Sequence, residues 1–143
     1  MLSIPLAQKL KNAGLTWTPG PRDFFAVPDR GMDDQVFVLN YMMVGTGMVH
    51  GEPVVTFYGT TEMPIDYLPL TEAVWLPSET QLRTLLEERL IRHGETGLHL
   101  TSTTHGYRCQ VQFRGETVVF DGFSVDEAYG LALLHVMKDQ QAQ

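Results

Sequence analysis

The feature that most constrains this chain is its last helical segment, residues 125–138, because apolar residues cover almost its whole circumference. A helix that is apolar all round must be buried on more than one side. Ser124 and, three residues later, Glu127 predict a capping box at the start of this helix. The helix therefore needs either a central position inside its own domain or a second subunit that covers it.

Both ways of burying this helix remain open from the sequence. Gly130 and Ala132 allow a close approach of either kind of neighbour. A second copy of the chain could pack against the large residues of this helix, which would give a homo-oligomer. The helix could equally be buried in the core of a monomer. The candidate interface residues are Tyr129, Leu131, Leu133, Leu134 and Met137.

Between Leu98 and Arg114, apolar and polar residues alternate with a period of two, which predicts a β-hairpin with one side exposed to solvent. The inward side carries Tyr107, Cys109 and Val111. The outward side is the one locally basic and polar surface of an acidic chain. We interpret it as a solvated sheet face, with RNA or an acidic partner as the alternative ligand. This polar face consists of His99, His105, Arg108, Gln110, Gln112 and Arg114.

The remaining elements come from caps, turns and apolar runs. Ser3 caps a first helix that ends at Gly14, and Ser78 with Gln81 forms a capping box for a second helix. The predicted order has no strand–helix–strand alternation, so the sequence predicts an α+β fold, a largely antiparallel sheet with three helices packed against it. Further strands are expected at residues 24–27, 35–44, 53–60, 73–76 and 117–120, with 35–44 and 53–60 forming a long hairpin.

Length and charge limit the classes of protein. A chain of 143 residues predicts one domain, residues 1–138, with a frayed tail at 139–143. The net charge of −7 makes nucleic acid an unfavourable partner, although a protein partner is compatible with it. The uncharged segment 35–51 is shorter than the ~20 apolar residues of a membrane span, so no membrane association is expected. One cysteine and no visible export signal indicate the cytoplasm.

The candidate chemistry is sparse. The glycine-rich segment 45–51 lacks the Lys-Ser/Thr pair and the following helix of a phosphate loop, so no cofactor is expected. Asp29, Asp33 and Asp34 do not have the spacing of a calcium loop, and we interpret them as an acidic turn without a metal. Cys109 and His105 could form a cysteine nucleophile, but burial on the inward face disfavours ionisation of the thiol.

Three stretches carry a resemblance to known families: Trp75-Leu76-Pro77 with the capped helix at Gln81-Leu82, the hairpin near Tyr107, and Ser124-Val125-Asp126-Glu127-Ala128. Together they resemble small uncharacterised α+β proteins of bacterial and prophage genomes, which implies no particular activity. The hairpin and last helix alone are similar to HicB-type antitoxins, which implies a regulatory protein linked to nucleic acid.

The sequence therefore supports three hypotheses of function. The favoured one is a noncatalytic binding or assembly protein that self-associates. The alternatives are a regulatory, antitoxin-like protein and a small enzyme with a site near His105 and Cys109.

Overall fold

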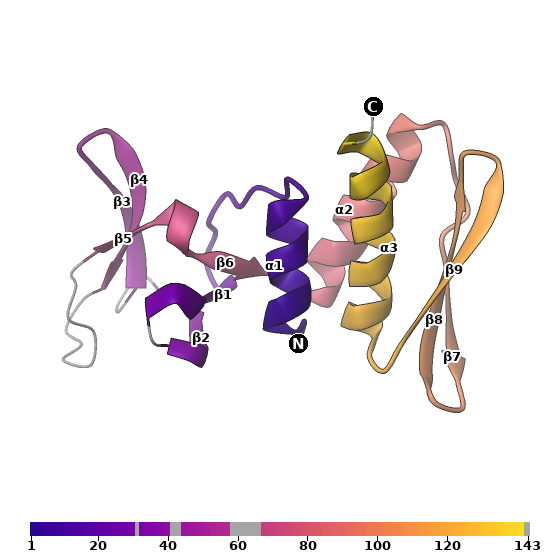
Figure 1. Cartoon of the computed structure of the whole chain (residues 1–143), viewed down its shortest axis with the longest axis horizontal. Coiled ribbons are helices and arrows are strands. Elements are labelled where there is room, and N and C mark those ends of the chain that lie inside the picture. Colours follow the sequence, from indigo (N-terminus) through magenta and orange to yellow (C-terminus); the bar gives the residue numbers. More distant parts are fainter. Residues whose placement is uncertain (31, 41–43, 58–66, 142–143) are drawn as a thin grey trace. The chain divides into compact units, whose positions relative to one another are not determined.

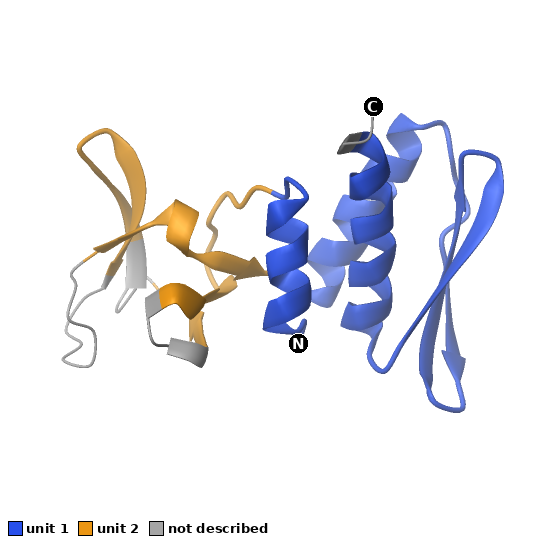
Figure 2. Cartoon of the chain, in the orientation of Figure 1, with its two compact units in different colours: residues 1–15, 77–143 blue, residues 16–76 orange. Residues whose placement is uncertain are grey.

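The computed structural model describes residues 1–30, 32–40, 44–57 and 67–141 (Figure 1). They fall into two compact units (Figure 2). We name residues 1–15 with 77–143 the helical unit, and residues 16–76 the strand unit. Each is described by itself below. The expectation of a single domain over residues 1–138 stays a prediction.

The described residues form three helices and three antiparallel sheets of three strands each, so the α+β class is confirmed. The helical unit holds all three helices and the sheet of strand order β7-β8-β9. Its elements are α1 (Ile4–Asn12), α2 (Glu79–Arg92), β7 (His99–Thr103), β8 (Gly106–Phe113), β9 (Glu116–Gly122) and α3 (Val125–Gln141).

The predicted caps start the helices. The Ser3 hydroxyl accepts a hydrogen bond from the Leu6 backbone N–H at 3.3 Å, where α1 begins. Ser78 and Gln81 form both hydrogen bonds of a capping box before α2, at 3.2 and 2.9 Å. Each satisfied N–H is one that the first helical turn would otherwise leave without a partner.

Helix α3 is the central element of the helical unit. It contacts α1, α2, β8 and β9, and Figure 1 shows it between the other helices and the sheet. Gly130 makes the contact with α1 close, because a Cβ atom there would lie 2.9 Å from side-chain carbons of Leu2 and Leu6. The helix is also longer than predicted: it includes Asp139 and Gln140, which the sequence assigned to a frayed tail.

The strand unit consists of two small sheets. One has the order β2-β1-β6 and the other β3-β4-β5, and all described pairings are antiparallel. Phe25, Val27, Leu39, Val55, Leu68 and Ala73 form one buried cluster between them. The strands are β1 (Phe24–Val27), β2 (Met32–Val38), β3 (Val44–Val49), β4 (Glu52–Phe57), β5 (Tyr67–Pro69) and β6 (Val74–Leu76), with short 3₁₀ turns at Pro28–Arg30 and Leu70–Glu72.

The predicted long hairpin is wrong in its pairing. Residues 35–44 are not one strand: β2 pairs with β1, and Val44 begins β3, which pairs with β4. Gly45 and Gly47, which lie beyond the end of the predicted strand, are inside β3. The true turn is His50-Gly51, where both residues have positive φ, 52° and 80°, as a two-residue turn of type I′ requires. Parts of both predicted strands, residues 41–43 and 58–60, lie outside the described residues.

A buried carboxylate fixes the loop that precedes β1. Asp23 is 7% exposed, and its Oδ2 accepts hydrogen bonds from Trp17 Nε1 and from the Gly20 backbone N–H, both at 2.9 Å. The Trp17 ring lies 5.4 Å from the Phe25 ring, centroid to centroid. The loop is therefore held to the core of the strand unit by one polar and one aromatic contact.

None of the described helices has the length and apolar character that crossing a membrane would need.

Candidate functional site

The sheet β7-β8-β9 has one covered face and one open face, as its period-two pattern predicts. Tyr107, which was expected on the covered face, is 36% exposed. Cys109, Val111 and Phe113 alternate along β8 and are buried, at 0–3% exposure. α3 contacts β8 and β9. Because successive side chains of a strand point to opposite faces, Arg108, Gln110 and Gln112 share the other face.

The structure brings most of the predicted polar face together. His99 pairs with Gln110 across β7 and β8, and Arg108 and Gln112 lie on the same side of β8. The other two members lie in turns: His105 between β7 and β8, and Arg114 between β8 and β9. The His105 ring nitrogen Nδ1 is 2.9 Å from the Thr104 hydroxyl.

The positive charge expected on this face is neutralised. Arg108 binds Asp121 of β9 through two hydrogen bonds, at 2.7 and 3.2 Å. The side-chain hydrogen bond raises the pKa of Arg108 and lowers the pKa of Asp121, which favours the charged form of each. Arg114 pairs with Asp139 of α3 at 2.8 Å. With each arginine matched by a carboxylate, the face is polar but not basic.

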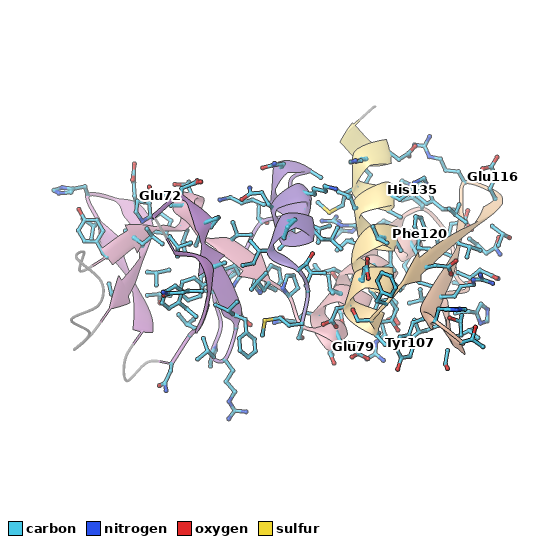
Figure 3. All side chains as sticks on the ribbon, turned by 60° about the horizontal axis from the view of Figure 1, so that its bottom comes forward. Glu72, Glu79, Tyr107, Glu116, Phe120 and His135 are labelled. Carbon is cyan, nitrogen blue, oxygen red and sulfur yellow. The ribbon has the colours of Figure 1, made fainter. Side chains whose placement is uncertain are left out.

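The candidate interface on the last helix is buried within the chain. Tyr129, Leu133, Leu134 and Met137 are between 0 and 7% exposed, and Leu131 is half-buried. Of the two alternatives left open by the sequence, the structure therefore favours the core helix. On α3, His135 is exposed, and its ring centroid lies 5.4 Å from that of Phe120. Figure 3 labels both residues.

Cys109 and His105 are not brought together in a common pocket. Cys109 is fully buried on the covered face, and burial raises the pKa of its thiol to about 11. His105 is exposed and lines a hollow that does not include Cys109. A thiol with so high a pKa is a poor nucleophile at neutral pH.

The other predicted motifs have structural roles. The segment 45–51 forms strand β3 and its hairpin turn rather than a loop before a helix. Asp29 lies in a 3₁₀ turn, whereas the side chains of residues 33 and 34 lie outside the described residues. Within the described ranges, no group of three or more metal-ligating side chains comes together.

An unpaired strand edge is the first feature that the sequence reasoning missed. β7 is an outer strand of its sheet, and all five of its residues, His99–Thr103, are exposed. None of the five is Asp, Glu, Lys, Arg, Gly or Pro. Leu100 is 37% exposed. The signal in the sequence was this uncharged composition, which we interpreted only as half of a hairpin.

A hollow at the end of the same sheet is the second missed feature. We name it the end hollow; it measures about 290 Å³ and lies where the β7–β8 turn meets the junction of β9 and α3. Phe123 beside it is 84% exposed. The end hollow is lined by Thr103, Thr104, His105, Tyr107, Arg108, Asp121, Gly122, Phe123 and Glu127.

The position of Phe123 in the sequence gave a misleading signal. An apolar residue just before a helix cap usually packs against the fourth helical residue, here Ala128. Ala128 is buried, yet Phe123 points its ring into solvent. Only the tertiary structure shows that this aromatic residue is exposed.

No family model matches this sequence, and searches of the curated proteins and of the solved structures find no similar chain.

Proposed function

We propose that this chain is a noncatalytic assembly protein that self-associates by pairing the β7 strands of two copies. The observation that carries the proposal is the outer strand His99–Thr103, which has one unpaired edge, no charged residue and every residue exposed to solvent. An outer strand presents a row of backbone N–H and C=O groups that can pair with another strand. Charged residues, prolines and bulges usually prevent this, and β7 has no charged residue or proline.

The other outer strands in the described part of the chain are protected by their composition. β9 carries Glu116 and Asp121, and β2 contains Asp33 and Asp34. β5 ends in Pro69, β3 has two glycines, and β6 has only three residues. Such features disfavour edge-to-edge pairing. The contrast supports β7 as the pairing edge.

Apolar surface accompanies this edge. A hollow of about 230 Å³ lies next to the start of β7 and is lined in part by Leu90, Ile91 and Leu98. Ile91 is 65% exposed. Exposed apolar groups beside an open strand favour a protein partner over a purely solvated surface.

A second copy of the chain is the partner that these features fit best. Antiparallel pairing about a two-fold axis at Thr101 places Leu100 opposite Ser102 of the other copy, and no like charges face each other. Two-fold dimers are the commonest oligomers because one surface serves both subunits. The net charge of −7 makes two copies repel each other overall. The repulsion is weaker when they meet along β7, because this strand has no acidic residue.

Nucleic acid is less well supported as a partner, because Arg108 and Arg114 are each paired with a carboxylate. A location in the cytoplasm forms part of the proposal, since a lone buried Cys109 suits a reducing compartment.

Light scattering coupled to size-exclusion chromatography tests the proposal, over a concentration range of about 10 to about 500 μM. The weight-average mass of the wild-type chain should rise towards that of a dimer. Thr101→Lys, which places two lysines near each other across the pairing edge, should keep the chain monomeric at every concentration.

Thr84→Lys is the matched control, because Thr84 is an exposed threonine on α2 and its replacement makes the same change of charge. It should dimerise like the wild type. A wild-type chain that stays monomeric over the whole range would refute the proposal. Equal dimerisation of Thr101→Lys and Thr84→Lys would show that the copies associate elsewhere.

A further inference from the structure

We propose that the end hollow binds a positively charged side chain, arginine or lysine, from a basic segment of a partner protein. The end hollow shares one lining residue, Thr103, with β7. The proposal rests on Tyr107, Phe123 and Glu127, which lie outside β7, so its test is independent of the test of self-association. It combines a rigid backbone, two aromatic rings and an unmatched carboxylate.

Two glycines hold the backbone around the end hollow in close contact. A Cβ atom at Gly106 would clash with the carbonyl oxygen of Gly122, and one at Gly122 would lie 2.7 Å from the Ala128 nitrogen. The start of β8, the end of β9 and the start of α3 thus approach one another closely at main-chain atoms. A wall of packed backbone is preorganised, which lowers the entropic cost of binding.

Aromatic groups provide a surface for an extended side chain. Phe123 is the most exposed large apolar residue of the described chain, at 84%, and Tyr107 is 36% exposed. Both line the end hollow. Arginine and lysine pack their stems along such rings and place their charge near the ring face.

The charges lining the end hollow leave one carboxylate unmatched. Arg108 and Asp121 neutralise each other through their two hydrogen bonds. Glu127 accepts a hydrogen bond from the Phe123 backbone N–H at 2.8 Å through Oε2, and no ion pair to Glu127 occurs within the described residues. Its negative charge beside Phe123 and Tyr107 favours a cation.

The same acidic residue argues against an anionic ligand at the start of α3. The Ser124 hydroxyl already accepts from the Glu127 N–H at 3.1 Å, and Asp126 and Glu127 occupy the first turn. A basic partner is also favoured at long range, because the chain carries 17 acidic and 10 basic residues. A basic protein segment therefore fits the end hollow better than phosphate or an acidic peptide.

Nuclear magnetic resonance titration of the ¹⁵N-labelled full chain tests the proposal, with acetyl-Gly-Arg-Gly-amide as the probe and acetyl-Gly-Gln-Gly-amide as the matched neutral peptide. The arginine peptide should cause saturable shifts in the amides of residues 103–108 and 121–128, with a dissociation constant of about 1 mM or weaker for so small a ligand. The glutamine peptide should not.

Two variants test the groups that carry the proposal. Phe123→Ser removes an exposed ring, and Glu127→Gln removes the charge while its amide oxygen can still accept the Phe123 N–H. Each should weaken binding about threefold to tenfold. Glu116→Gln is the control, because Glu116 lies at the opposite end of the β8–β9 hairpin from Tyr107, as Figure 3 shows.

Glu116→Gln should bind the arginine peptide like the wild type, and so should Thr101→Lys, whether or not the chain dimerises. Equal shifts with the glutamine peptide, undiminished binding by Glu127→Gln, or no saturable shifts in the named segments would each overturn the proposal.

Discussion

Replacing Gly106 by alanine should destabilise the helical unit by about 4 kcal/mol. Gly106 has a φ of 154°, and a Cβ atom there would overlap the carbonyl oxygen of Gly122 and lie 3.0 Å from the Phe123 Cα. Because the obstacles are backbone atoms, no side-chain rotation relieves the overlap. Overpacking costs about 1–3 kcal/mol, and holding alanine in a conformation that suits glycine costs about another 1–3 kcal/mol.

Gly115→Ala is the control for a glycine with positive φ and no neighbouring atoms. Gly115 also has a positive φ, 77°, and lies in a turn of the same sheet, but nothing lies within 4 Å of an added Cβ. Gly115→Ala should therefore lower the free energy of unfolding by only about 1 kcal/mol, which is the cost of holding alanine in the left-handed backbone conformation. The difference between the two variants, about 3 kcal/mol, measures the close approach of the start of β8 to the end of β9 together with the greater backbone strain of alanine at Gly106.

Urea denaturation followed by far-ultraviolet circular dichroism is the assay, because the three described helices all belong to the helical unit. With a denaturant slope of about 2 kcal/mol/M, Gly106→Ala should lower the midpoint by about 2 M and Gly115→Ala by about 0.5 M. Trp17 and Trp75 both lie in the strand unit, so their fluorescence follows that unit separately. A loss in Gly106→Ala no larger than that in Gly115→Ala would refute the reasoning.

Three further outcomes follow from burial and hydrogen bonding. Leu133→Ala should lower the free energy of unfolding by about 3 kcal/mol, because Leu133 is fully buried on α3, whereas Leu131→Ala should lower it by about 1 kcal/mol or less. Equal losses of stability in urea denaturation would contradict the role of α3 as the core helix. Asp23→Ala should destabilise the strand unit by about 2 kcal/mol, measured by tryptophan fluorescence, because the N–H groups of Trp17 and Gly20 lose their acceptor. Cys109, with a pKa of about 11, should be ionised in about one molecule in three thousand at about pH 7.5, against about one in ten for an ordinary thiol. Its reaction with an aromatic disulfide reagent should therefore be at least about a hundredfold slower than that of the urea-unfolded chain, and comparable rates would show that the thiol is accessible and reactive.

The elements near a strong local signal were predicted well. Ser3, Ser78 and Ser124 mark the starts of the three helices to within a residue, because a cap is a contact between residues three positions apart. The alternation of Cys109 and Val111 with polar neighbours likewise gave the buried and open faces of β8. Such patterns depend only on the geometry of one element.

Strand pairing was predicted less well. Both sides of residues 35–44 are apolar, so the pattern fits several pairing partners, and Gly45 and Gly47 of β3 were left outside the predicted strands. Register and partner are decided by contacts between distant segments, which no local pattern records. The same holds for the candidate polar face, where Asp121 and Asp139 approach the arginines from other elements.

The sequence by itself determined the α+β class, the three helices and the need to bury the last of them, because caps and periodicity act over a few residues. Only the tertiary structure decided that α3 is buried in its own unit, that β7 is an open edge of its sheet, and that Phe123 is exposed to solvent near Glu127. Those outcomes depend on which surfaces meet in space, and burial is shared between residues that lie far apart in the chain.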